Sequence, residues 1–139
     1  MKIITEKLFV STRGNPDLIN ITPYLEKIIS RHKLKEGLLT VFVVGSTTAI
    51  TTFEYEPGLI EDVKAMFEKV IPSNESYQHD LTWNDANGFS HLRAALQGPS
   101  LSIPFTEGKL VLGTWQQVVL AEFDIRARER QVAVQIIAE

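Results

Sequence analysis

The sequence predicts an α+β fold in a single domain over residues 1–139, with largely antiparallel, β-sandwich-like sheets and two to three helices. Three observations support this class. Strand-like and helix-like segments follow one another in a mixed order rather than in strict alternation. One helix with an apolar face is clear in the middle of the chain, and the last third is rich in strand-like segments. The length favours one domain, since chains of this size bury roughly 68–70% of their unfolded surface.

The N-terminal part begins with a strand-like segment over residues 2–12, followed by a turn at residues 13–17. A helix is expected over residues 22–32, because Thr22 is suited to cap it and a proline follows at its first position. Residues 38–44 form an apolar, β-branched run that predicts a strand buried on both faces. After a Gly-Ser-Thr-Thr interruption, the strand pattern resumes at residues 49–53.

The clearest helix spans residues 59–71, where apolar side chains repeat with a period of about 3.6 residues. Residues 73–88 contain few aliphatic side chains and predict a long polar loop, a kind of loop that is often functional. A short helix is expected at residues 90–97. Strands then follow at residues 100–105, 109–112, 115–123 and 128–137, and the last of these alternates between an apolar and a more polar face.

Composition limits the chemistry that is available. Cysteine is absent, which excludes disulfides, thiolate chemistry and cysteine-bound metals, so nitrogen ligands must come from His32, His79 or His91. The net charge of −3 argues against a general binder of nucleic acid or of anionic membranes. No apolar run approaches the roughly 18–20 residues that span a bilayer. Glu6 and Lys7 interrupt the first apolar stretch, so we expect no signal peptide and a cytoplasmic location.

The first candidate group is formed by His79, Asp80 and His91. If the loop and the following helix bring the two imidazoles together, they could hold a zinc-like ion with a carboxylate or water. The alternative is a solvated His79 and a half-buried, hydrogen-bonded His91. His32 is expected to be a solvated residue at a helix end, where cationic side chains are favoured.

Two further segments could bind phosphate. Ser46, Thr47 and Thr48 follow a buried strand and offer hydroxyl and amide groups, although a simple turn explains them as well. Arg126, Arg128 and Arg130 alternate, which in a strand would align three guanidinium groups on one face. The alternative for these arginines is a set of ion pairs with neighbouring carboxylates.

Other polar residues could complete a site. Glu54, close to Glu56, is a possible metal ligand or general base, or a solvated strand end. Asn84, Asp85 and Asn87 could orient a substrate or hold a hydrated Mg²⁺, or they could serve only the turn in which they lie. Trp115, Gln116 and Gln117 could line a pocket for a flat ring, or be a packed tryptophan with surface amides.

A longer set of segments shares one order along the chain: Gly45-Ser46-Thr47-Thr48-Ala49-Ile50-Thr51 with Glu54, Tyr77 with His79-Asp80, Asn87, Ser90-His91-Leu92-Arg93-Ala94, Gly98-Pro99-Ser100, and Leu112-Gly113-Thr114-Trp115-Gln116-Gln117 before Glu122 and Asp124. Taken together, these segments resemble the YjbQ family of secondary thiamine-phosphate synthases over about residues 21–137. The first motif of that family reads His-Thr-Thr-Ala or His-Thr-Ser-Ala, and here Ser46 occupies the His position.

The resemblance implies a divalent metal, Mg²⁺ or Zn²⁺, in a cluster that has three histidines in the family. This chain retains His79 and His91, so Glu54 or water would complete the site, with Asp80 as a further catalytic group. A hydroxyl is a poor zinc ligand at neutral pH, so Ser46 is expected only as a substrate contact.

The resemblance also implies a homotrimer that joins a hydroxymethylpyrimidine pyrophosphate to a thiazole phosphate and releases pyrophosphate. In this reading the partner is a small phosphorylated substrate, with no nucleic acid and no membrane. Phosphate would contact Arg126, Arg128 or the hydroxyls of Thr47 and Thr48, and the ring site would be lined by Asn84, Asn87 and Gln116. Two other functions stay open: metal-dependent hydrolysis of a phosphorylated small molecule, and a non-catalytic, ligand-binding trimer.

Overall fold

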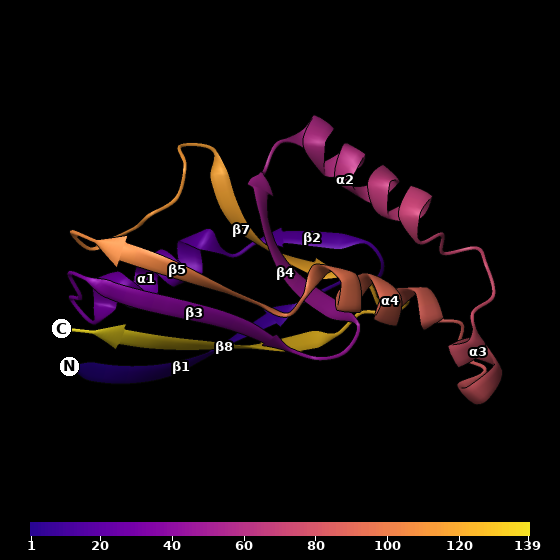
Figure 1. Ribbon diagram of the computed structural model, residues 1–139, viewed down its shortest axis with the longest axis horizontal. Helices are drawn as coiled ribbons and strands as arrows, with labels where there is room; N and C mark the ends of the chain where they lie inside the picture. The colour runs from indigo at the N-terminus through magenta and orange to yellow at the C-terminus, as the bar shows by residue number, and fades with distance from the viewer.

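Strands and helices follow one another along the chain in a mixed order (Figure 1). The computed structural model describes residues 1–139. Its elements are β1 (Lys2–Ser11), β2 (Asp17–Asn20), α1 (Thr22–Arg31), β3 (Gly37–Val44), β4 (Thr48–Glu54), α2 (Pro57–Val70), α3 (Gln78–Trp83), α4 (Gly88–Gln97), β5 (Ser100–Thr106), β6 (Lys109–Leu110), β7 (Gln116–Glu122) and β8 (Glu129–Ala138).

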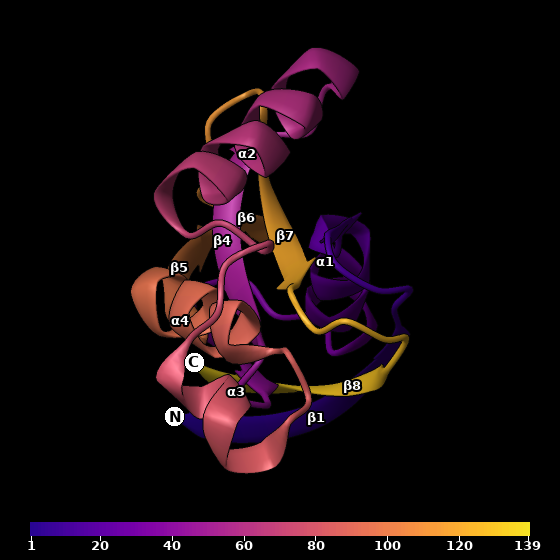
Figure 2. The same ribbon diagram turned by 90° about the vertical axis from the view of Figure 1, so that its right-hand side faces the viewer.

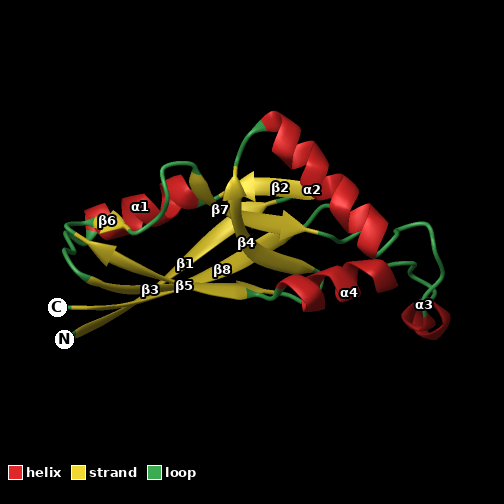
Figure 3. Cartoon of the chain, turned by 45° about the horizontal axis from the view of Figure 1, so that its top comes forward, coloured by secondary structure: helices red, strands yellow, loops and turns green.

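The strands form two antiparallel sheets. The larger sheet has the order β1-β8-β3-β5-β6 and the smaller has the order β2-β7-β4. The two sheets cross one another, as the strands in Figure 3 show, and the long strands of the larger sheet lie side by side. The predicted α+β class with antiparallel, sandwich-like sheets is therefore confirmed.

The main core lies between the inner face of the larger sheet, the smaller sheet and α1. Strand β8 shows how the sequence directs this burial. Val132, Val134 and Ile136 alternate with more polar residues and are fully buried, as predicted from their spacing. On α1, Leu25 and Ile29 complete the same cluster from the other side.

The prediction that residues 38–44 are buried on both faces is wrong. In β3, Leu39, Val41 and Val43 are fully buried, while Phe42 and Val44 remain 43% and 49% exposed. The reason is that β3 lies between β8 and β5 in a sheet whose outer face is covered by no other element of this chain. Apolar side chains therefore remain on that outer face.

Two elements were not predicted. Strand β2 forms after the turn because its backbone pairs with β7. The pattern of side chains in the sequence does not show this pairing. Helix α3 lies within the segment predicted as a polar loop, so the helices number four rather than two to three. Thr22 was predicted to cap α1, but Ile21 is at that position, and the Thr22 hydroxyl accepts a hydrogen bond from the Val118 amide at 2.7 Å.

The helices α3 and α4 lie at the end of the molecule opposite the two chain termini (Figure 1). Viewed from that end, α3 is in front, with α4 behind it and α2 above (Figure 2). A second apolar cluster, which includes Phe67, Ala94 and Phe123, holds α2 and α4 against the smaller sheet. No helix combines the length and apolar character that crossing a membrane requires.

Candidate functional site

The structure brings His79 and His91 together. His79 lies in the first turn of α3 and His91 in the first turn of α4, and their ring centroids are 4.4 Å apart with an angle of 42° between the planes. Both rings line a surface cavity of about 300 Å³ with Tyr77, Gly88 and Leu92. The two imidazoles that sequence spacing alone could only suggest as neighbours thus share one cavity.

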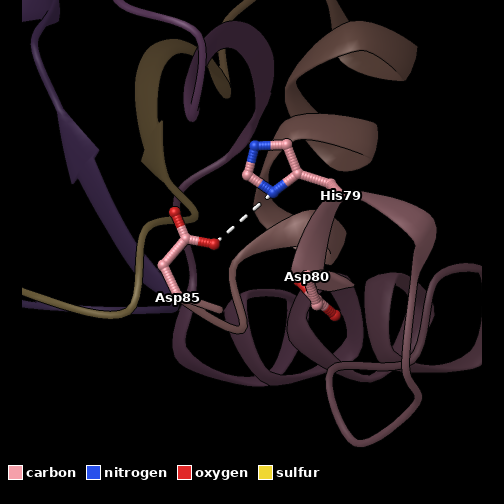
Figure 4. A group of neighbouring side chains, drawn as sticks. All are labelled: His79, Asp80 and Asp85. Atoms are coloured by element: carbon pink, nitrogen blue, oxygen red, sulfur yellow. Dashed lines mark ion pairs between the residues drawn. The ribbon is translucent and has the colours of Figure 1, made fainter. Parts of the chain in front are cut away.

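Asp85 is the carboxylate that pairs with His79. Its Oδ1 lies 3.5 Å from His79 Nδ1, and the two side chains are 41% and 31% exposed. Figure 4 shows the ring nitrogen facing the carboxylate. Potential ligand atoms of His79, Asp80 and Asp85 lie within 4.8 Å of one another. Sequence reasoning considered Asp85 with the neighbouring asparagines and missed its contact with His79, because the short helix that folds the loop back was not predicted.

Asp80 has a structural role in this geometry. Its two carboxylate oxygens accept hydrogen bonds from the Tyr77 amide at 3.0 Å and the Gly88 amide at 2.8 Å. These bonds, the one from Tyr77 foremost, hold the pKa of Asp80 below its ordinary value. A Cβ on Gly88 would lie 2.7 Å from Tyr77 Cβ, so only glycine allows this close approach. Asp80 therefore fixes the start of α3 to the start of α4.

The two asparagines differ in their roles. Asn84 ends α3 in the left-handed conformation with φ 55°, a position that asparagine tolerates well, and its side chain is exposed. Asn87 is buried, and with its amide nitrogen oriented toward Asp85 it donates to both carboxylate oxygens at 3.0 and 3.2 Å. Asn87 thus orients the carboxylate that faces His79.

Arg93 holds α4 in place, and sequence reasoning did not assign it a role. The side chain is buried and donates hydrogen bonds to the Ile71 carbonyl, Asn15 and Glu68. Its guanidinium also lies 4.9 Å from the ring centroid of Phe89. His91 lies two residues earlier on the same helix, so the contacts of Arg93 fix the part of α4 that carries the imidazole.

Glu54 and Gln116 are not near the histidine pair. They face each other across the β4–β7 pairing, at the end of β4 away from the His91 cavity. The seven residues of β4 separate this end from Thr48 by about 20 Å. Glu54, Trp115 and Gln117 line a different cavity of about 430 Å³. Glu54 is therefore not placed to complete the cluster at His79 and His91.

The hydroxyl groups of Thr47 and Thr48 are engaged inside the protein. Thr47 Oγ1 donates to Asp124 at 3.1 Å and accepts from Arg130 at 2.6 Å, and Thr48 Oγ1 donates to the Ala121 carbonyl at 2.9 Å. Ser46, in contrast, is exposed and lines a cavity of about 470 Å³ together with His91. Of the three hydroxyls considered for phosphate, only that of Ser46 faces a cavity that also includes a candidate imidazole.

The arginines follow the ion-pair alternative. Arg128 donates to Asp124 at 3.0 and 2.7 Å, and Arg130 donates to the fully buried Glu122 at 2.8 and 2.6 Å. Burial raises the pKa of Asp124, but hydrogen bonds from Arg128, the Ile125 amide and Thr47 outweigh it, so the net shift is downward. Arg126 is exposed and is the one arginine of the three outside this network.

The structure therefore places His79 beside both His91 and Asp85, with Asp80 in the same group of potential ligands, and Ser46 lines the neighbouring cavity. Imidazole nitrogen and carboxylate oxygen are donors that suit Zn²⁺, and carboxylate with water suits Mg²⁺. The side chains of His79, Asp85 and His91 are at least partly accessible, so an ion bound there would keep positions for water or a substrate. The residues present thus fit a divalent cation.

Comparison with known proteins agrees with this set of motifs. The family model described as UPF0047 protein YjbQ-like matches residues 6–139. A UPF0047 protein of Archaeoglobus fulgidus is 37% identical over 131 residues, which cover 94% of this chain and 99% of that protein. A UPF0047 protein of Methanothermobacter thermautotrophicus is 36% identical over 136 residues, or 98% of this chain and 93% of that protein.

Solved structures show the same fold. A crystal structure described as a YbjQ-like protein of unknown function from Sulfolobus solfataricus P2 superposes with a TM-score of 0.92 at 36% identity, covering 99% of each chain. A hypothetical protein from Aeropyrum pernix K1 gives a TM-score of 0.91 at 32% identity, covering 98% of this chain and 99% of that one. Sequence motifs, full-length matches and fold agree, and the chain belongs to the YjbQ (UPF0047) family.

Proposed function

We propose that the protein binds a divalent cation, Mg²⁺ or Zn²⁺, at His79, Asp85 and His91, and acts there on a small phosphorylated substrate. The observation that carries the proposal is that two imidazoles share one surface cavity and that an oriented carboxylate, Asp85, lies against one of them, His79. A cation bound there would neutralise charge on a phosphate or pyrophosphate group. Asn87 holds the carboxylate, while Asp80 and Arg93 hold the two helices that carry the imidazoles.

The specific reaction we propose is thiamine-phosphate synthesis, as the resemblance of the motifs implies. The bond between the pyrimidine methylene carbon and the pyrophosphate oxygen breaks, and a bond from that carbon to the thiazole nitrogen forms. This substitution needs no protein nucleophile, so the task of the site is to stabilise the leaving anion and align the two reactants. In this reaction His79, Asp85 and His91 would face the leaving group, and Ser46 would contact the substrate beside His91.

The test compares wild type with two histidine variants. His79→Ala removes a proposed ligand. His32→Ala removes an imidazole at the C-terminal end of α1, away from the site, where it contacts Glu6 of β1 at 2.7 Å. Each protein is incubated with both substrates and Mg²⁺ or Zn²⁺, while thiamine phosphate and inorganic phosphate are followed by chromatography, and bound metal is measured by elemental analysis.

We expect product from wild type and His32→Ala, and a loss of at least about 100-fold in His79→Ala, as is typical when a group that stabilises a leaving anion is removed. No thiamine phosphate from wild type would refute the synthase assignment. Release of inorganic phosphate instead would identify a hydrolase, and stoichiometric binding without turnover would identify a ligand-binding protein.

We also propose that the protein assembles as a homotrimer. The outer face of the larger sheet supports assembly, because Ile3 and Phe9 on β1 and Phe42 and Val44 on β3, the two strands that flank β8, are each more than 40% exposed. Light scattering after size exclusion should give three times the 15.6 kDa chain mass. Phe42→Lys should lower the measured mass, and a monomeric wild type would refute the proposal.

A further inference from the structure

A second cavity is lined by His91 but not by His79. It has a volume of about 470 Å³ and lies between the turn that joins β3 to β4 and helix α4. The turn contributes Gly45, Ser46 and Thr48, and the helix contributes His91, Leu92 and Ala95. Its volume is within the range of small-molecule sites in proteins, which is about 300–1,000 Å³.

The walls of this cavity are mostly apolar, although the turn is rich in hydroxyl residues. The Thr48 hydroxyl is bonded to the Ala121 carbonyl, and its methyl group lies beside Gly45. Arg130 lies directly behind Gly45, but its charge is paired with the buried Glu122. On the helix side, Leu92 and Ala95 present hydrocarbon. The hydroxyl of Ser46 is thus left as the polar group that the turn can offer to a ligand.

Gly45 keeps the cavity open. Its φ of 154° lies in a region that side-chain-bearing residues rarely adopt, and a Cβ there would lie 2.7 Å from Arg130 Nη1 and 3.0 Å from the Thr48 methyl carbon. A larger residue would therefore displace the turn. The backbone can follow this path beside α4 only because glycine is at this position.

The two cavities are continuous in their lining residues. His91 and Leu92 line both the 470 Å³ cavity and the 300 Å³ cavity that contains His79. A ligand whose charged group lies at His79 and Asp85 would extend past His91 into the apolar cavity. The phosphate of a substrate would then lie at His79 and Asp85, and its organic part would lie in the apolar cavity.

We infer that the cavity between Gly45, Ser46 and Ala95 is a subsite for the ring-bearing, apolar part of a small organic phosphate. The site at His79, Asp85 and His91 takes the anionic part, and this half of the inference rests on the proposed function. Ala95 is the specificity-determining position, because it lines the cavity, is exposed, and lies one helical turn after His91. The subsite itself requires neither the cation nor the phosphate.

The experiment uses probes that separate the two halves. Benzyl alcohol, which carries a ring and no charge, is titrated into ¹⁵N-labelled protein while amide shifts are followed by NMR. Benzyl phosphate and inorganic phosphate are then compared in the presence of Mg²⁺. The variant Ala95→Trp fills the cavity, and Ala65→Trp is its control, because Ala65 is an exposed alanine on α2 that lines no cavity.

We expect benzyl alcohol to shift the amides of Gly45, Ser46 and Ala95 in wild type and Ala65→Trp, and to bind Ala95→Trp at least tenfold more weakly. Benzyl phosphate should bind wild type about tenfold more tightly than inorganic phosphate, the preference a partly buried ring would give. Absence of these shifts in wild type, or equal binding by Ala95→Trp, would overturn the subsite. Binding of benzyl alcohol with no binding of either phosphate would refute the proposed phosphate site and leave the apolar subsite standing.

Discussion

Replacing Arg130 by methionine should destabilise the fold strongly. Glu122 has no exposed surface, and its carboxylate accepts hydrogen bonds from Arg130 Nε and Nη2, the Thr12 hydroxyl and the Asp124 amide. Methionine preserves the apolar part of the side chain but removes the charge and both bonds. The carboxylate would then be buried with only a hydroxyl and one amide as donors.

The expected loss in the free energy of unfolding is about 3–5 kcal/mol, the cost of leaving one member of a buried ion pair without its partner. The pair is fully inside the protein, with the two side chains 9% and 0% exposed, so solvent screening does not reduce this figure. The same substitution also removes the bond from Arg130 to Thr47 at 2.6 Å, which supports the turn that carries Ser46.

The measurement is urea unfolding at pH 7, with Arg126→Met as the matched control. Arg126 is exposed on the same segment, so its loss should change the free energy by no more than about 0.5 kcal/mol. Adding Glu122→Gln to Arg130→Met should recover at least about 1 kcal/mol, because the unpaired charge is removed. A loss below about 1 kcal/mol for Arg130→Met would refute the reasoning.

Three more predictions concern the helices and the turn. Arg93→Met should cost about 2–3 kcal/mol by urea unfolding, because it removes the hydrogen bonds to the part-buried Ile71 carbonyl and the cation–π contacts, and a cost equal to that of Arg126→Met would contradict this. The lowered pKa of Asp80 means that its stabilising contribution is present above the ordinary value of 3.8 and lost as the pH falls through the folded-state pKa. The NMR contact between the two imidazoles should therefore weaken on acidification below about pH 4 in wild type, whereas Asp80→Asn should already show the weakened contact at pH 7. Ser46→His should raise zinc affinity at least tenfold by competition with a chelator, since it adds an imidazole beside His91, and unchanged affinity would place position 46 outside the site.

The sequence was most informative where one physical rule decides the structure. Helix α2 and strand β8 follow from apolar periods of 3.6 and 2, because burial of one face is sufficient to define each. Strand β2 could not be predicted, since its stability depends on pairing with β7 across most of the chain. For β3, local hydrophobicity did not reveal which face another element would cover.

Some features of the candidate site could also be predicted from the sequence, and others could not. The pairing of His79 with His91 was a reasonable expectation, because loop and helix are adjacent in sequence. The contacts of Thr47 and Arg128 could not be predicted, since their partner Asp124 lies in the connection from β7 in the smaller sheet to β8 in the larger sheet. Alternation predicted aligned guanidinium groups, but it could not show that buried carboxylates already neutralise two of them.

The proposed cation site differs from the family motif at position 46, and other groups of the chain would take the place of the missing imidazole. A catalytic zinc site needs three protein ligands and one open position. With Ser46 at the position that resemblance assigns to a third imidazole, His79 and His91 supply two ligands. In the proposal Asp85, which lies against His79, supplies the carboxylate, since Asp80 accepts from two amides and Glu54 lies at the far end of β4. Replacing nitrogen by a carboxylate oxygen makes the donor set harder and favours Mg²⁺ relative to an all-imidazole site. The smaller serine also lines the cavity beside His91, so in the proposed site the substitution that would change the cation preference would also open the apolar cavity to a substrate.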